Sequence, residues 1–343
     1  MPIHSSVYWP VVVKEGQAVL KTSYERGGTQ KDVYSESDVI KVACPLCAAS
    51  GSHRIYRERG ALGIVRCDSC GLMYVSPRLK EPEKVYWGDA EKYFTEARLI
   101  FEGKARHHRD PNYLADLSVI ERYKPRGNFL DIGTNMGFFL RNARGRGWTI
   151  YGVEPSPSLS EMARKYFGLN VRTAFLETAG FDSSFFDVVT MTDVFEHLTE
   201  PKKMLAEVHR ILKPDGIVFI KVPNGLFNIL KLSIARMAGK LSDYDIFDSY
   251  EHVVHYSQDT LKRMLHACGF KALKFYIGAP IQLPVWHKYV GQYYQYPSPP
   301  GLDRKRQTAR SLFHLISVLE FYCRFGSIGY CAPNIIVIAG KSG

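Results

Sequence analysis

The sequence lacks the marks of a membrane or exported protein. No apolar run reaches the roughly 18 to 20 residues that a membrane-spanning helix needs. The first residues, MPIHSSVYWPVV, have neither the basic start nor the apolar block of a signal peptide. The seven cysteines are an odd number, which argues against a disulfide framework. These absences favour a cytoplasmic protein.

Two familiar phosphate-binding loops are missing as well. No stretch fits the G-x-x-x-x-G-K-[ST] motif of nucleotide hydrolases. The G-x-G-x-x-G pattern of dinucleotide folds is interrupted, because Asn135 stands at its middle position. No internal repeat is present either. The sequence is still compatible with a parallel α/β fold that has a different glycine loop.

Acidic residues are scarce in the last third of the chain. Residues 223–343 carry 14 Lys and Arg against 7 Asp and Glu, so they hold most of the net charge of +11. The excess is densest in DRKRQTAR at 303–310. Such a segment is typical of a solvated helix face, or of a surface that meets an acidic partner: a nucleotide-linked or phosphorylated substrate, nucleic acid or an anionic membrane.

Composition and hydrophobic pattern divide the chain into four parts. From 127 to 222 strand-like runs such as NFLDI and FFDVVTMT alternate with helical ones, which predicts a parallel sheet with helices on both faces. With two later strands the sheet has about seven, which gives a Rossmann-like α/β fold. The predicted parts are an extension and linker at 1–40, a cysteine module at 41–80, a helical lead-in at 81–126, and a main domain at 127–343 with insertions at about 223–257 and 279–331.

Four of the cysteines are paired in sequence. Cys44 and Cys47 frame CPLC, and Cys67 and Cys70 frame CDSC. Two such C-x-x-C knuckles have the ligand spacing of a tetrahedral zinc ribbon. With four protein ligands and no open position, the zinc would be structural. The sequence thus predicts a small N-terminal zinc-ribbon module.

The glycine loop NFLDIGTNMGFFL indicates which ligand the main domain binds. Asp131 ends the predicted strand, and Gly133 and Gly137 frame the loop that leads into a helix. A carboxylate at this place repels phosphate but suits a ligand with a cationic amino acid end, such as S-adenosylmethionine. Glu154 ends the next strand, where a carboxylate can accept hydrogen bonds from both hydroxyls of a ribose.

Together these motifs resemble the class I S-adenosylmethionine-dependent methyltransferases. The matching stretches are LDIGTNMGFFL, GVEPS, FDVVTMTDVFEHL, RILKPDGIVFIKVPN and YEHVVHYSQDTLKRMLHACGF. The stretch CPLC…VRCDSCGLMYVSPR resembles the zinc ribbon of a subgroup often associated with methylation of sugars or small metabolites. The resemblance covers residue 41 to about 278 and the final strand. It departs from the family pattern at Thr134 and Asn135, where a glycine or a cysteine–glycine pair is usual.

The resemblance implies roles for particular positions, which we list by the part of the cofactor that they would contact. The cofactor loop would consist of Asp131, Gly133, Thr134 and Gly137, and Glu154 would bind the ribose. Phe175 and Leu176 would flank the adenine, and Thr192 and Asp193 would lie beside the methionine end. Alternatively, Phe175 and Leu176 are core residues and Asp193 is a helix cap.

Histidines are the candidates for activating the methyl acceptor. His197, in DVFEHL, follows the fourth predicted strand, at the edge where ligands bind in open α/β folds, and is predicted to be a general base or an orienting group. A second group, Glu251, His252, His255 and Tyr256, would lie on the insertion. The H-x-x-H spacing of His252 and His255 also permits a metal pair. His107 and His108 are expected to be exposed.

The sequence therefore predicts a methyltransferase whose acceptor is a small, anionic metabolite such as a nucleotide-linked sugar. An RNA methyltransferase is a second hypothesis, since zinc ribbons and basic surfaces also serve nucleic acids. A third is a binding module that has kept the cofactor fold without turnover. The acceptor, the atom that is methylated and the oligomeric state are left open.

Overall fold

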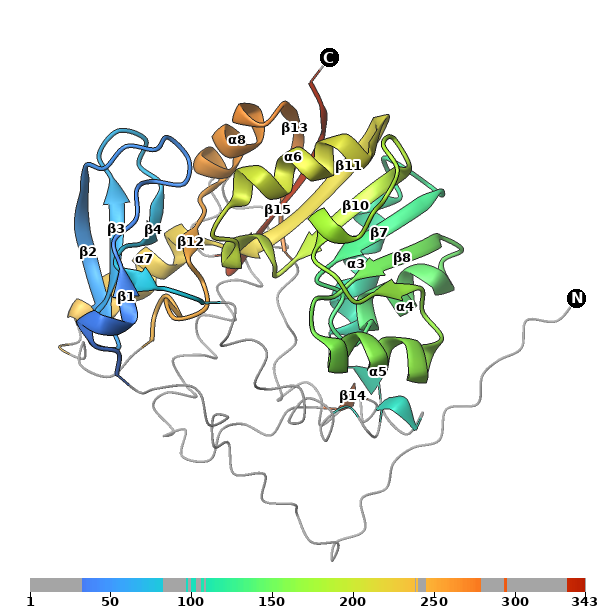
Figure 1. Cartoon of the computed structure of the whole chain (residues 1–343), viewed down its shortest axis with the longest axis horizontal. Coiled ribbons are helices and arrows are strands. Elements are labelled where there is room, and N and C mark those ends of the chain that lie inside the picture. The colour runs from blue at the N-terminus through green and yellow to red at the C-terminus, as the bar shows by residue number, and fades with distance from the viewer. Residues whose placement is uncertain are drawn as a thin grey trace, which may run out of the picture.

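The computed structural model describes residues 33–82, 109–237, 245–278 and 332–342, with short pieces at 97, 100–102, 106–107, 239 and 293–294. Most of the predicted extension at 1–40 and of the insertion at 279–331 lies outside these residues. Figure 1 shows a large twisted sheet with helices on both faces and a smaller sheet beside it. Among the described helices, none combines the length and the apolar character that a membrane crossing requires.

The large sheet has seven strands, in the order β13-β15-β11-β10-β7-β8-β9. All run parallel except β15, which is antiparallel to both of its neighbours. This confirms the predicted Rossmann-like, mostly parallel sheet. The strands are β7 (Asn128–Ile132), β8 (Thr149–Val153), β9 (Val171–Arg172), β10 (Phe186–Thr192), β11 (Leu212–Pro223), β13 (Phe270–Ile277) and β15 (Asn334–Lys341).

Helices cover both faces because neighbouring residues of the central strands point to opposite sides. Phe129 and Val188 belong to one apolar cluster with residues of α3, α4 and α5, whereas Leu130 and Val189 belong to another with residues of α6 and α8. The helices are α3 (Asp110–Ile120), α4 (Phe138–Gly145), α5 (Pro157–Phe167), α6 (Pro201–Ile211), α7 (Gly225–Met237) and α8 (Gln258–Ala267). Short 3-10 helices lie at η1 (Glu36–Asp38), η2 (Leu176–Thr178) and η3 (Phe195–His197).

The smaller sheet joins the cysteine module to a segment far away in the sequence. Its strand order is β12-β4-β3-β2. Strand β12 (Val254–His255) comes from the predicted insertion and pairs with β4 (Met73–Val75). The other strands are β2 (Ser52–Glu58) and β3 (Leu62–Cys67), and two short pairs join β1 (Val39–Ile40) to β5 (Arg78–Leu79) and β6 (Arg106–His107) to β14 (Tyr293–Tyr294). The insertion is therefore built into the cysteine module's sheet.

Candidate active site

The loop between β7 and α4 has the backbone that its glycines suggest. Gly133, Asn135 and Gly137 all have positive φ, at 69°, 52° and 84°. A side chain at 133 would also place its Cβ 2.5 Å from a methyl group of Val194. The loop therefore needs glycine at 133 for space as well as for conformation.

Asp131 lies buried beneath this loop. Its carboxylate accepts a hydrogen bond of 2.7 Å from the Thr190 hydroxyl, and the Thr134 hydroxyl donates to the Asp131 backbone carbonyl at 2.8 Å. Burial raises the pKa of Asp131 to about 7, although the hydroxyls of Thr190 and Thr134 oppose the shift. A cationic group placed nearby would hold this carboxyl in its charged form.

Glu154 stands at the end of β8 and is also buried. Its two carboxylate oxygens accept hydrogen bonds from the backbone N–H groups of Asn135, at 2.8 Å, and Ser156, at 2.9 Å. Burial raises its pKa, and these two N–H groups oppose the rise. The carboxylate is thus fixed across the mouth of the glycine loop, and each oxygen keeps a further lone pair for a ligand.

Phe175 and Leu176 follow β9 but have different surroundings. Phe175 is 49% exposed, whereas Leu176 is 1% exposed and packs in the main core cluster. Of these two residues, Phe175 alone presents a large apolar surface to a ligand at this end of the sheet.

Thr192 and Asp193 end β10 and turn the chain toward η3. The Thr192 hydroxyl is buried and has no hydrogen-bond partner among the described residues. Asp193 has a positive φ of 55° and forms an ion pair with Arg109. Burial alone would raise the pKa of Asp193, but the charges of Arg109 and Lys221 hold it below its ordinary value. A carboxylate that stays charged therefore lies beside the histidines of the next turn.

His197 lies in a cluster with Glu196 and His252. The rings of His197 and His252 are 4.8 Å apart, and their Nε2 atoms lie 3.7 Å and 4.0 Å from Oε1 of Glu196. Burial, with His252 nearby, lowers the pKa of His197 to about 3. Burial also lowers the pKa of His252, whereas burial together with Asp193 raises that of Glu196 well above its ordinary value.

His255 and Tyr256 are buried away from this cluster. The His255 ring packs against Phe247 at 5.1 Å, and Tyr256 stacks on Phe195. His255 is not in either of the two groups of described residues that could hold a metal ion. Of the H-x-x-H pair, only His252 belongs to such a group, and sequence reasoning missed Glu196, which joins it. The expectation for His107 was wrong: it is 4% exposed and stacks on Phe138, while His108 lies outside the described residues.

The cysteine module fixes the segment that carries His252. The carboxylate of Glu58, in β2, accepts hydrogen bonds of 2.7 to 2.9 Å from the backbone N–H groups of Ile246, Phe247 and Ser249. The next residue, Arg59, forms an ion pair with Asp245. A buried carboxylate bound by three N–H donors is a strong anchor. Nothing in the spacing of Glu58 along the sequence indicates this role.

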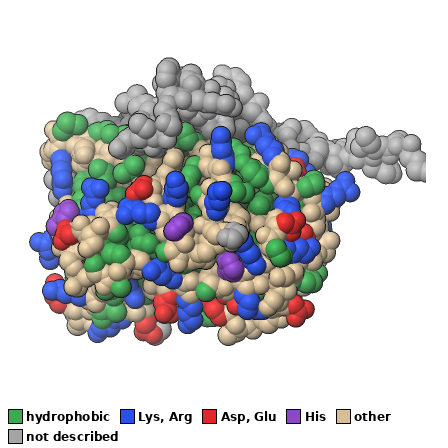
Figure 2. Space-filling model, turned by 90° about the horizontal axis from the view of Figure 1, so that it is seen from above, with side chains coloured by type: hydrophobic (Ala, Val, Ile, Leu, Met, Phe, Trp, Pro, Cys, Tyr) green, Lys and Arg blue, Asp and Glu red, His purple; other side chains and the backbone are tan. Residues whose placement is uncertain are grey.

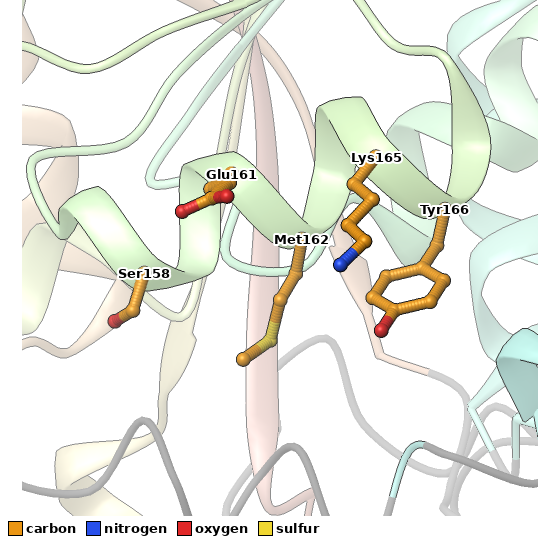
Figure 3. Close-up of a pocket in the computed structure, with 5 residues that line it drawn as sticks. All are labelled: Ser158, Glu161, Met162, Lys165 and Tyr166. Carbon is orange, nitrogen blue, oxygen red and sulfur yellow. The ribbon is translucent and has the colours of Figure 1, made fainter.

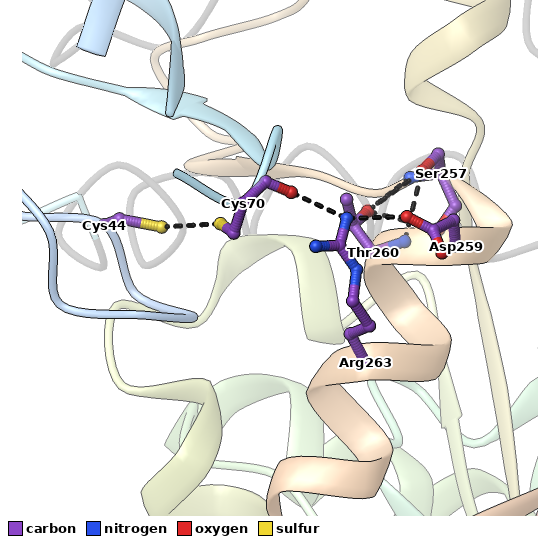
Figure 4. Close-up of polar contacts among 6 residues, drawn as sticks. All are labelled: Cys44, Cys70, Ser257, Asp259, Thr260 and Arg263. Carbon is purple, nitrogen blue, oxygen red and sulfur yellow. Dashed lines mark hydrogen bonds and ion pairs between the residues drawn. The ribbon is translucent and has the colours of Figure 1, made fainter. Parts of the chain in front are cut away.

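The four paired cysteines converge as predicted. Their sulfur atoms lie within 4.8 Å of one another, with 3.4 Å between Cys44 and Cys70 and 3.5 Å between Cys47 and Cys67. In each knuckle a backbone N–H returns to the first cysteine's carbonyl, from Ala48 and from Gly71. Figure 4 shows that Arg263 of α8 donates to the Cys70 carbonyl, so the second knuckle is attached to the main domain.

Two surface features lie apart from these groups. A hollow of about 220 Å³ follows the outside of α5, where Met162, Lys165 and Tyr166 line it together with Ser158 and Glu161 (Figure 3). None of these is a predicted site residue. Figure 2 shows Lys and Arg side chains dispersed over one face among apolar and acidic ones. On that face the basic residues do not gather into a single patch.

Comparisons with known proteins agree with the fold. Residues 105–274 match the family model described as a methyltransferase domain. A ubiquinone/menaquinone biosynthesis C-methyltransferase of Burkholderia mallei is 28% identical over 187 residues, which cover 48% of this chain and 77% of that protein. A ubiquinone biosynthesis O-methyltransferase of Pasteurella multocida is 25% identical over 164 residues, which cover 41% and 67%.

Among solved structures, a chain from the complex of the Haloferax volcanii Trm112 methyltransferase activator with a putative methyltransferase has a TM-score of 0.48 and 17% identity. The alignment covers 74% of this chain and 98% of that one. The family match covers the stretch that holds the glycine loop and the cluster at η3. The match and the curated relatives favour an enzyme over a binding module without turnover: the chain contains a class I S-adenosylmethionine-dependent methyltransferase domain, and the protein is an enzyme of that kind.

Proposed function

We propose that the protein methylates a small molecule held at the carboxyl edge of the large sheet, against η3 and residues 245–256. The observation that carries this is the contact between the two segments. The backbone N–H of Val253 donates to the carbonyl of Glu196 at 2.9 Å, and Nδ1 of His197 lies 3.0 Å from the carbonyl of Glu251. The end of β10 and the insertion therefore form one wall beside the cofactor loop.

The buried carboxylates support the cofactor orientation that the family resemblance implies. Asp131 would pair with the ammonium group of S-adenosylmethionine, because its pKa of about 7 makes a cationic partner favourable. Glu154, which the loop backbone holds in place, would accept hydrogen bonds from the ribose. The remaining contacts would be made by Gly133, Thr134 and Gly137 in the loop, by Phe175 and Leu176 at the adenine, and by Thr192 and Asp193 at the methionine end.

The acceptor that we favour is an anionic metabolite such as a nucleotide-linked sugar. The basic excess of residues 223–343 supports an anionic group on the substrate. The curated relatives, which are named for quinone biosynthesis, support a small-molecule acceptor. The histidines would orient it. A pKa of about 3 makes His197 a weak proton acceptor at neutral pH, so an orienting role suits it better than that of a general base, with His252 beside it and His255 behind.

We further propose that the four cysteines bind one structural zinc ion. Four sulfur atoms within 4.8 Å of one another suit a tetrahedral thiolate site with no position left for substrate. A thiolate site of this kind needs reduced cysteines, as in the cytoplasm, where we propose that the protein acts.

Transfer of an isotopically labelled methyl group tests the proposed function. The enzyme would be incubated with labelled S-adenosylmethionine and, separately, nucleotide-linked sugars, the matching free sugars, quinone-type phenols and purified RNA. We expect label in a small molecule, with a nucleotide-linked sugar preferred over its free sugar. Label in RNA alone would overturn the proposal, and label in a phenol alone would overturn the anionic sugar while keeping the small-molecule class.

A further inference from the structure

Glu196 is a buried carboxyl group that the described structure leaves unsatisfied. The residue is 2% exposed, and neither carboxylate oxygen has a hydrogen-bond partner in another described residue. An unpaired carboxyl group in such a place costs free energy, since water can no longer solvate it. Glu196 lies at the carboxyl edge of the sheet, beside the cofactor loop. This position suggests that a bound ligand supplies the missing partner of its carboxyl group.

The two imidazoles of the cluster are already oriented toward Glu196. Nδ1 of His197 lies 3.0 Å from the Glu251 carbonyl. This ring therefore uses one nitrogen on the backbone and turns Nε2 toward the carboxyl group, at 3.7 Å, and Nε2 of His252 lies 4.0 Å from the same oxygen. Metal-binding histidines are held in the same way, because the backbone contact fixes which nitrogen carries the proton.

A simple ion pair does not explain the cluster. Among the described residues Glu196 has no lysine or arginine as an ion-pair partner, and its two imidazole neighbours lie beyond hydrogen-bond distance, at 3.7 Å and 4.0 Å. Asp193, by contrast, already has Arg109 as its cation. The cluster thus offers two imidazole nitrogens and a carboxyl group that lack a cation, which a bound metal ion would supply.

We propose that Glu196, His197 and His252 bind a divalent first-row transition-metal ion. Two imidazoles and one carboxylate are the ligand set that zinc and non-haem iron accept, and three protein ligands leave coordination positions open. The three ligand atoms lie within 4.8 Å of one another. Ligands at about 2.1 Å around such an ion are roughly 3 to 3.5 Å apart, so the side chains approach by about 1 Å.

The open positions give the ion a role that rests on the proposed function. An acceptor hydroxyl bound there releases its proton to water more readily, because the ion stabilises the oxygen anion. That oxygen then forms a bond to the methyl carbon while the carbon–sulfur bond breaks. The bonding electron pair stays on sulfur, which leaves neutral S-adenosylhomocysteine. The site would therefore activate oxygen without a histidine base.

The test uses cobalt(II) as the probe, without acceptor or cofactor. The four cysteines are first saturated with zinc, and cobalt(II) is then titrated into the full-length protein. We expect one further equivalent per chain, with the visible absorption of a nitrogen- and oxygen-ligated ion and without thiolate charge-transfer bands. Glu196→Gln and His252→Ala should each weaken this binding at least tenfold to a hundredfold. His266→Ala, at an exposed position on α8, is the matched control and should bind as the wild type does.

Two measurements keep the outcomes distinct. Thermal melting and calorimetric binding of S-adenosylhomocysteine show whether each variant is folded and keeps its cofactor site. If the wild type binds cobalt(II) no more tightly than a folded Glu196→Gln variant does, the metal site is wrong. Methyl transfer without cobalt dependence would also overturn its role while leaving the proposed function intact. Absence of methyl transfer with intact cobalt binding would instead count against the proposed function.

Discussion

The cofactor side and the acceptor side of the active site are built differently. On the cofactor side, Asp131 and Glu154 have hydrogen-bond partners within the large sheet and its loops, from Thr190, Asn135 and Ser156. On the acceptor side, several buried polar atoms have no hydrogen-bond partner among the described residues; they belong to Glu196, His255 and Tyr256.

The difference follows from how each side is assembled. The cofactor side comes from neighbouring strands and the short loops that follow them, so loop backbone can satisfy Glu154 and the adjacent strand can satisfy Asp131 through Thr190. The acceptor side joins β10, the insertion and the cysteine module, whose β4 pairs with β12. Polar groups that already have hydrogen-bond partners can bind a ligand without rearrangement. Buried polar groups without partners gain hydrogen bonds when a ligand binds. The predictions below separate the two sides.

The largest effect is expected from breaking the cysteine cluster. Cys44→Ser should remove the zinc ion and unfold the module, since structural zinc sites contribute about 10–16 kcal/mol to folding. Because the same module anchors residues 245–249 through Glu58, turnover should be abolished. S-adenosylhomocysteine affinity should stay within a few fold. Elemental analysis, melting and calorimetry measure the three quantities.

Cys268→Ser is the control for this prediction, because Cys268 lies outside the cluster. It should keep the zinc content and the turnover of the wild type. Freshly purified wild-type protein without zinc, or a Cys44→Ser variant with normal turnover, would show that the acceptor side does not depend on the module.

Removing a histidine imidazole should affect only the acceptor side. Because His197 is proposed to orient the acceptor, we expect His197→Ala to lower turnover by about a hundredfold, the loss that a misplacement of about 1 Å can cause. Cofactor affinity should change by only a few fold, because His197 contacts Glu251 and Glu196 rather than the glycine loop. His252→Ala should follow with a smaller loss. If His252→Ala alone abolishes turnover, the order of the two residues is reversed, and if neither substitution lowers turnover, neither histidine orients the acceptor.

The anchor at Glu58 tests whether the module acts by positioning. Glu58→Gln keeps the size of the side chain but replaces a carboxylate that accepts three backbone N–H bonds, each worth roughly 1.5 to 3 kcal/mol. Turnover should fall by about tenfold to a hundredfold while zinc content and cofactor affinity are kept. Glu36→Gln, at an exposed position in η1 just before the cysteine module, should have no effect. Equal kinetics for both variants would contradict positioning by Glu58.

The contrast between the cofactor side and the acceptor side also explains which parts of the site could be predicted from the sequence. Asp131, the glycine loop, Glu154 and the cysteine pairs are local patterns, and each depends on residues close together in the chain. Glu196 and Glu58 depend on contacts across more than 50 and more than 180 residues, with Val253 and with Ile246. No local spacing encodes such a contact. His107 shows the same limit, because its burial depends on Phe138, which lies in another element.

On the cofactor side, Glu154→Ala should weaken S-adenosylhomocysteine binding by about tenfold or more. The substitution removes the proposed charge-assisted hydrogen bonds to the ribose, at roughly 1.5 to 3 kcal/mol each. It also frees the backbone N–H groups of Asn135 and Ser156. Glu177→Ala, at an exposed position in η2, is the control. Unchanged calorimetric affinity in a folded Glu154→Ala variant would place the ribose contact elsewhere.

The smallest expected effect is a pH dependence set by Asp131. Its pKa of about 7 in the folded protein lies above the ordinary value of 3.8, so the carboxyl group is neutral at pH 6 and mostly charged at pH 8. Because the ammonium group of the cofactor favours the carboxylate, affinity should rise by up to about tenfold per pH unit below 7 and then level off.

The free energy of unfolding of the ligand-free protein should fall as pH rises, whereas cofactor affinity rises. Two opposite trends from one group make the assignment to Asp131 specific. Between the unfolded pKa of 3.8 and the folded value of about 7, the folded state binds the extra proton, so Asp131 lowers stability as pH rises through this window. Asp131→Asn removes both trends, leaving a weaker affinity that hardly changes between pH 6 and 8. Calorimetry with S-adenosylhomocysteine and urea unfolding over the same pH range measure the pair. If affinity and stability change with pH in parallel for wild type and Asp131→Asn, the cofactor's ammonium group does not pair with Asp131. Cofactor binding then does not stabilise the charged form of this buried carboxyl group.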